Sequence, residues 1–291
     1  MLILAGPISY TQALILGLLQ GFAELFPISS LGQSVVLPHL FGWNIHQNAN
    51  YFISFLVATH LATALVLLGF FWRDWVRILR GLWRSIVERE VSAERNPDGV
   101  LGWLLVVGTI PAGILGLLFE NSLRALFASA TSAALFLIGN GLLLFAAEQL
   151  RRRAPQVSED SDERIARTTR WPHALLIGAA QALALIPGFS RAGASMGGGL
   201  LVGLSNEDAA RFSFLLATPV IGAAAVLKLP ELLGSEGNGV RGPAVLAAAC
   251  AAVTAYLSVR FLVRYFQTKT LTPFAVFCVV EGIALSAYFL G

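Results

Sequence analysis

Six long apolar runs are the strongest constraint in the sequence, and they lie at about 51–72, 101–119, 124–147, 212–229, 243–262 and 273–290. A helix needs roughly 20 apolar residues to cross the hydrocarbon layer of a bilayer, and each run is long enough with some tilt. Only 13% of the residues are charged, whereas soluble domains carry about 25%. The sequence therefore predicts an all-α polytopic membrane protein with six transmembrane helices. It argues against a soluble enzyme, a disordered tail and a nucleic-acid-binding protein.

Two further apolar segments, at about 8–40 and 173–203, are interrupted near their middle by proline, glycine and serine. Proline removes a helical hydrogen bond and glycine permits unusual dihedral angles, so each segment should form two half-helices around a loop. Broken backbone at membrane depth is tolerated only inside protein or beside a water-filled cavity. We therefore expect two re-entrant helical hairpins, with eight full but kinked spans as the alternative.

The basic residues predict the orientation of the chain. Most of the 20 lysines and arginines lie at 73–100, at 148–172, at Arg211 and at 260–269, and the positive-inside rule assigns these regions to the cytoplasm. The segment 8–40 then enters and leaves from the outer side, and 173–203 does so from the cytoplasmic side. The sequence thus predicts a single integral-membrane domain built as an inverted-topology repeat. Its halves are approximately 1–147 and 173–291, its cytoplasmic linker is 148–172, and the charged stretch 158–164 is expected to be a solvated loop.

Glu24 is the only charged side chain in the first 72 residues. A carboxylate in an apolar segment is costly and marks a candidate functional site. Gln20 lies four residues earlier, so both side chains share one face of a helix. Ser29 and Ser30 stand where the next half-helix would begin. For Ser29 a simple N-cap is the alternative interpretation.

Arg191 is the only lysine or arginine between His173 and Arg211. Its guanidinium suits bidentate binding of phosphate oxygens. A glycine-rich turn that opens a helix adds free backbone N–H groups and the positive end of the helix dipole. The pattern predicts an anion site, and phosphate is the natural ligand. The alternative is an ion pair between Arg191 and Glu24 that ties the two hairpins together, and the two interpretations are compatible.

Four other polar residues interrupt apolar segments: His60, Asn140, Gln181 and Glu281. We expect them to be satisfied polar groups of the core rather than catalysts. The four histidines show no pairing on one helical face, so the sequence gives no support for a metal site of imidazoles.

The two interrupted motifs resemble those of the integral-membrane undecaprenyl-diphosphate phosphatases linked to bacitracin resistance. The family's first motif is Glu or Gln, three residues, then Glu, followed by Pro-x-Ser-Ser-x-Gly. It is matched by Gln20, Glu24, Pro27, Ser29, Ser30 and Gly32. The second motif is similar to Pro-Gly-x-Ser-Arg-Ser-Gly-Ala-Thr, and it is matched by Pro187, Gly188, Ser190, Arg191, Gly193 and Ala194. The likeness covers nearly the whole chain.

The chain departs from the family pattern at four positions. Leu31 replaces a threonine, Gln33 a histidine, Ala192 a serine, and Ser195 the closing threonine. Glutamine cannot carry a proton at neutral pH or form a phosphohistidine. Any mechanism that needs an imidazole at position 33 is therefore closed to this protein, and its activity is expected to be reduced.

The resemblance implies hydrolysis of undecaprenyl diphosphate to undecaprenyl phosphate, which recycles the lipid carrier of cell-wall synthesis. Ser30 is the expected nucleophile, with Ser29 second. Glu24 is expected either to take the hydroxyl proton or to hold a divalent cation. Arg191 and nearby backbone N–H groups would bind the phosphates. The other expected substrate-binding residues are Gln20, Gln33, Gly188, Ser190, Gly193 and Ser195.

The family resemblance also implies Mg²⁺ or Ca²⁺, with further ligands from the substrate's phosphates. It implies a polyprenyl diphosphate lipid as substrate and a site that faces the outer side of the bacterial inner membrane. A homodimer is left open. The alternative function is a transporter that flips a lipid phosphate or moves an anion without cleavage, because inverted repeats are transporter architecture.

Overall fold

The computed structural model describes residues 7–47, 49–126, 129–151, 160–234 and 237–291, and all regular secondary structure in these ranges is helical. Within them, six helices are long and apolar enough to cross a membrane. They are α3 (Asn50–Phe70), α5 (Pro97–Leu126), α6 (Ala130–Leu150), α10 (Asn206–Leu233), α11 (Arg241–Tyr265) and α12 (Thr272–Leu290). The predicted all-α fold is confirmed for the described residues, and these six helices are the candidates for the six predicted spans.

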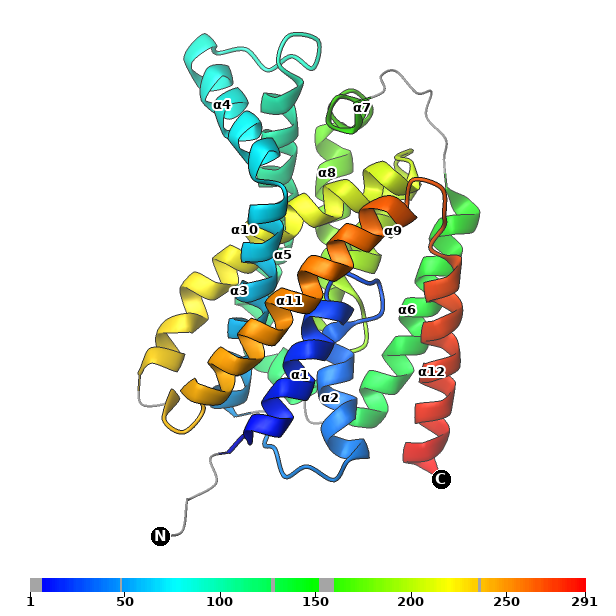
Figure 1. Ribbon diagram of the computed structural model, residues 1–291. Helices are drawn as coiled ribbons and strands as arrows, with labels where there is room; N and C mark the ends of the chain where they lie inside the picture. Colours follow the sequence, from blue (N-terminus) through cyan, green and yellow to red (C-terminus); the bar gives the residue numbers. More distant parts are fainter. Residues whose placement is uncertain (1–6, 48, 127–128, 152–159, 235–236) are drawn as a thin grey trace.

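The two interrupted segments fold as pairs of shorter helices. The first pair is α1 (Tyr10–Ala23) and α2 (Ser30–Leu40). The second is α8 (Trp171–Gln181), extended by the 3₁₀ turn η1 (Ala182–Leu185), and α9 (Arg191–Leu201). Figure 1 shows the turn between α1 and α2 near mid-height. The start of α1 and the end of α2 lie in the lower part of the view. The predicted half-helices around a loop are therefore present in both segments.

The helices that follow the two turns, α2 and α9, both begin with a serine N-cap. Ser29 caps α2 and Ser190 caps α9, and each hydroxyl oxygen accepts a hydrogen bond from the backbone N–H three residues later at 3.1 Å. Such a cap satisfies a donor that has no partner inside the helix. The proline and serine in each motif thus end one helix and begin the next.

The turns of the two helix pairs pack directly against each other. A Cβ atom on Gly32 would lie 2.9 Å from Cα of Gly188, so only glycine allows this approach, and Gly188 also has a φ of +110°. Asn140 of α6 bridges the two turns. Its Nδ2 donates to the carbonyl of Pro27 at 3.0 Å, and its Oδ1 accepts from the backbone N–H of Ser190 at 3.0 Å. The expectation that Asn140 is a satisfied core residue is confirmed, and its two bonds hold the turns in register.

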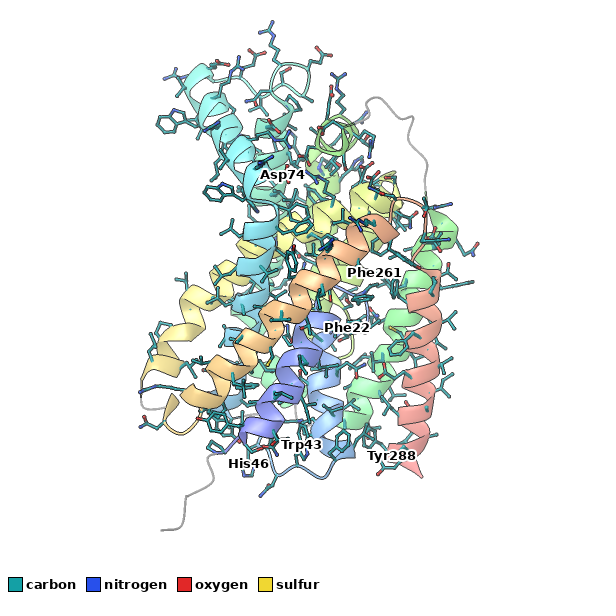
Figure 2. All side chains as sticks on the ribbon, viewed as in Figure 1. Phe22, Trp43, His46, Asp74, Phe261 and Tyr288 are labelled. Atoms are coloured by element: carbon teal, nitrogen blue, oxygen red, sulfur yellow. The ribbon has the colours of Figure 1, made fainter. Side chains whose placement is uncertain are left out.

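The charged segments gather at one end of the molecule. Helices α4 (Trp72–Glu88) and α7 (Ser161–Thr168) and the connection between α11 and α12 all lie at the top of Figure 1. Figure 2 shows the same crowding of polar side chains around α4 and α7, with Asp74 labelled. Segments far apart in the sequence that were predicted to share one side of the membrane are therefore found at one end of the fold.

The expectation of a solvated loop at 158–164 is wrong for the residues that the structure describes there. Residues 161–168 form α7, and Asp162 is only 2% exposed. Its carboxylate accepts from Arg77 at 2.7 Å and from Arg211 at 2.6 Å. Burial of this charge is possible because α4 and α10 each supply a cation. Hydrogen bonding to Asp208 similarly raises the pKa of Arg164 on α7 above its ordinary value. Residues 158 and 159 lie outside the described ranges.

Candidate active site

A cavity of about 600 Å³ lies where the two turns meet helices α3, α5 and α10. One end is polar, because Ser30, His60 and Arg191 contact Glu24 there, and Ser29 and Ser190 are their neighbours in the chain. Thr109 and Gln181 are the other polar side chains of the lining. The rest of the wall is apolar and includes Ala112, Gly113, Gly116, Leu117, Leu185, Val220, Ile221 and Leu227. A cavity with a small polar end and a long apolar wall matches a ligand that has a polar head and a hydrocarbon tail.

Glu24 is the centre of the polar end, and it is only 5% exposed. Its Oε2 accepts hydrogen bonds from Oγ of Ser30 at 2.7 Å and from Nε2 of Gln20 at 3.2 Å. Its Oε1 accepts from Nε of Arg191 at 3.1 Å, and Nε2 of His60 lies 3.2 Å from Oε2. The carboxylate therefore joins four elements of the fold: α1, α2, α3 and α9. The hydrogen bond between Gln20 and Glu24 confirms the prediction that both side chains lie on one face of the helix.

Arg191 begins α9, and two of its three guanidinium nitrogens bind the protein. Its Nε binds Glu24, and its Nη1 donates to the carbonyl of Ser213 at 3.3 Å. Its Nη2 is buried and has no hydrogen-bond partner, and the side chain lines the cavity. A buried donor without a partner is costly, and an anionic oxygen in the cavity would satisfy it. The ion pair with Glu24 is thus present and still leaves a donor for a ligand.

The two serines of the first motif have different surroundings. The hydroxyl of Ser29 donates to the carbonyl of Phe189 at 3.0 Å and accepts from the N–H of Gly32. Ser30 instead donates to the carboxylate of Glu24. A serine hydroxyl that points at a carboxylate has a base in place to take its proton. Of the two serines, Ser30 has the arrangement that a nucleophile needs.

Five residues that we expected to bind substrate lie outside the cavity lining: Gln20, Gln33, Gly188, Gly193 and Ser195. Gln33 donates to Oε2 of Glu281 on α12 at 2.7 Å. Ser195 donates to the carbonyl of Arg191 at 2.9 Å and lies 2.6 Å from Oγ of Ser213. The N–H of Gly193 is used by the cap of α9. Of these residues, Gln20 still contacts the site through its hydrogen bond to Glu24, whereas Gln33 contacts Glu281 outside it.

Sequence reasoning missed two residues of the cavity, His60 and Gln181. His60 faces Glu24 instead of resting in the core, and its Nδ1 lies 2.7 Å from the carbonyl of Leu56. A carbonyl only accepts, so Nδ1 carries a hydrogen. Gln181 donates to the carbonyl of Gly108 at 2.9 Å, and its Oε1 is buried without a partner. The available signal was the rarity of such side chains in apolar spans; nothing in the sequence tied them to Glu24.

The side chains of the cavity do not fit a resident divalent cation. The described residues contain no group of three or more histidine, cysteine, aspartate or glutamate side chains that could hold a metal ion. Among the described residues that line the cavity, Glu24 is the one carboxylate. Both its oxygens already contact donors, two of them from basic side chains. Magnesium and calcium prefer several oxygen ligands, and neighbouring cations repel them.

The sequence was also compared with known proteins. Residues 13–284 match the family model described as "Bacitracin resistance protein BacA". The chain belongs to the BacA family. Three relatives that carry undecaprenyl-diphosphatase names align over nearly their whole length. The protein of Mycolicibacterium paratuberculosis is 48% identical, over 94% of this chain and 95% of the relative. That of Granulibacter bethesdensis is 46% identical, over 95% and 96%, and an "Undecaprenyl-diphosphatase 2" of Frankia alni is 42% identical, over 97% and 98%.

The BacA match confirms the resemblance seen in the two motifs, and it holds despite the replacements at Leu31, Gln33 and Ala192. The matched region includes both turns, five of the six long helices and α12 as far as residue 284. Every residue at the polar end of the cavity therefore lies within the part of the chain that matches the family model.

Proposed function

We propose that the chain hydrolyses undecaprenyl diphosphate to undecaprenyl phosphate and inorganic phosphate in the bacterial inner membrane. The observation that carries the proposal is the 2.7 Å hydrogen bond from Ser30 to Glu24, beside the unpartnered Nη2 of Arg191. These three groups supply a nucleophile, a base and an anion donor in one cavity. The names of the BacA relatives point to the same reaction.

In the proposed reaction, Oγ of Ser30 attacks the terminal phosphorus as its proton passes to Glu24. The bond between that phosphorus and the bridging oxygen breaks, and undecaprenyl phosphate leaves. Water then cleaves the phosphoserine and releases phosphate, which restores the hydroxyl. Nη2 of Arg191 stabilises the charge on the transferred phosphoryl oxygens.

The lipid tail would follow the apolar wall of the cavity between α5 and α10 and continue into the bilayer. About 600 Å³ accommodates the diphosphate and the first part of the tail only.

We also propose that the α1–α2 and α8–α9 pairs are re-entrant hairpins that enter from opposite sides, which makes 1–147 and 173–291 inverted halves around the linker 148–172. The contact of Gly32 with Gly188 supports this plan. The site would then lie at the repeat interface and open to the outer side.

A divalent cation would enter as the counter-ion of the diphosphate, because the protein's own side chains do not fit a resident ion. Magnesium is commonly held through substrate phosphates in this way. Its contribution when bound is to neutralise phosphate charge. Transport without cleavage is not favoured, since it gives no role to a serine hydroxyl aimed at a carboxylate.

Phosphate release from undecaprenyl diphosphate by the purified protein in detergent, with Mg²⁺ added, tests the proposal. Glu24→Gln should lower kcat by at least about 100-fold, because an amide cannot take the serine proton. Glu281→Gln is the matched control, since it makes the same change at another intramembrane glutamate outside the cavity, and it should retain activity within about threefold. Release that is absent from the unmodified protein, or equal in Glu24→Gln, would refute the enzyme function.

A further inference from the structure

A second cavity, of about 490 Å³, lies at the end of α11, away from the site around Glu24. The last turns of α11 form one wall, and the residues that follow the helix form the other. Thr268 and Lys269 fold back onto the helix because their backbone N–H groups donate to the carbonyl of Tyr265, at 3.3 and 3.0 Å. These two hydrogen bonds hold the second wall of the cavity against the end of the helix.

The polar part of this cavity carries an unbalanced positive charge. Arg260, Arg264 and Lys269 line it, and no acidic residue in the described part of the chain does. The two arginines are four residues apart, so their side chains share a face of α11. Among the described residues, none of the three cations has an ion pair or a side-chain hydrogen bond. Other arginines at this end of the fold do pair with carboxylates, as Arg77 and Arg211 do with Asp162.

The part of the cavity farthest from the end of α11 is apolar and exposed. Leu257 is 59% exposed and Phe261 is 52% exposed, and both line the cavity. Figure 2 shows Phe261 on the upper part of α11, below the basic end of the helix. With a rise of 1.5 Å per residue, Leu257 lies roughly 10 Å from Arg264 along the axis, toward the middle of the span. The cavity therefore changes from positive at the helix end to apolar toward the membrane interior.

We propose that this cavity binds the headgroup phosphate of an anionic phospholipid, with the beginning of an acyl chain against Leu257 and Phe261. Arginine side chains bind phosphate oxygens in a bidentate manner. Basic pockets at the surface of a membrane attract acidic lipids. A zwitterionic headgroup carries its own cation, which the three basic side chains repel. A free phosphate ion would leave the apolar part of the cavity unused.

Native mass spectrometry of the purified protein tests this assignment by titration with phosphatidylglycerol, with phosphatidylcholine of the same acyl chains, and with inorganic phosphate. The unmodified protein should bind phosphatidylglycerol at least about tenfold more tightly than phosphatidylcholine. The triple variant Arg260→Gln, Arg264→Gln, Lys269→Gln should lose this preference. The control Arg73→Gln, Arg80→Gln, Arg89→Gln removes the same charge from exposed positions around α4, and its preference should change by less than about twofold.

Three results would overturn the proposal: a preference that survives in the cavity variant, an equal loss in the α4 control, or inorganic phosphate binding as tightly as phosphatidylglycerol. The second result would show that anionic lipids are attracted to the basic surface in general. The third result would show that the cavity binds free anions. A measurement on the unmodified protein adds an independent check. Raising the salt from about 0.05 to about 0.5 M should weaken phosphatidylglycerol binding and leave phosphatidylcholine unchanged. A preference that does not depend on salt would contradict the assignment.

Discussion

Nε2 of His60 lies 3.2 Å from Oε2 of Glu24, so an imidazole from α3 contacts the carboxylate that also binds Ser30. The position that carries histidine in related motifs is Gln33 here, and its side chain donates to Glu281 on α12 instead. The imidazole of this site therefore comes from a different helix. The lost histidine in the motif does not leave the carboxylate without a basic partner, because both His60 and Arg191 contact it.

His60 positions the carboxylate, so its removal should lower turnover. We expect His60→Ala to reduce kcat by about 10- to 100-fold with a smaller change in KM, since the affected contact is to the base and not to the substrate. His60→Gln retains a side-chain N–H donor and should recover much of the loss. Steady-state phosphate release measures both variants. Equal activity of His60→Ala and the unmodified protein would show that the contact has no catalytic role.

Restoring histidine at position 33 should have little effect. Because residue 33 faces Glu281 and lies outside the cavity lining, Gln33→His should change kcat by no more than about threefold. The same phosphate assay reports the result. A gain of tenfold or more would mean that an imidazole at this position reaches the reacting groups, and that the replacement had lowered an earlier activity.

The two serines should respond differently to substitution. Ser30→Ala removes the proposed nucleophile and should abolish measurable turnover. Ser29 has a φ of +65° and acts as the cap of α2, so Ser29→Gly keeps the backbone conformation. It costs a few tenths of a kcal/mol for the cap and about 1 kcal/mol more for the lost hydrogen bond to the carbonyl of Phe189. We expect this variant to fold and to retain at least about a tenth of the activity. The reverse ranking would assign the nucleophile to Ser29.

Asn140 should be important for stability as well as for activity. Asn140→Ala leaves the buried N–H of Ser190 without its partner, which costs about 1–3 kcal/mol, and leaves the carbonyl of Pro27 with only the 3.7 Å hydrogen bond from Sγ of Cys278. We expect a clear fall in Tm and reduced turnover, because the two turns lose their common support. Ser286→Ala on α12 is a suitable control, since its hydroxyl is buried and has no hydrogen-bond partner. A Tm for Asn140→Ala that matches this control would contradict the bridging role.

The fold was largely predictable because long apolar runs and proline–glycine breaks are local signals. They located the six long apolar helices and both turns. The ion pair of Glu24 with Arg191, which is present at 3.1 Å, was the alternative to an anion site and was inferred from the rarity of the two charges. His60 was missed because its contact with Glu24 depends on how α3 packs against the first turn, which no local pattern records. Ser195 and Gly193 were expected to face a ligand, but the capping and helix-packing bonds that engage them appear only in three dimensions. Asp162 was expected in water, since its partners Arg77 and Arg211 come from distant segments.

The stereochemical course at the transferred phosphorus tests the central claim most directly, because it does not require an intermediate to accumulate. Undecaprenyl diphosphate with a chiral, isotopically labelled terminal thiophosphate is hydrolysed, and the configuration of the released thiophosphate is determined. Attack by Ser30 followed by water makes two in-line displacements, so the account predicts net retention. Net inversion would show direct attack by water and would contradict a nucleophilic role for Ser30.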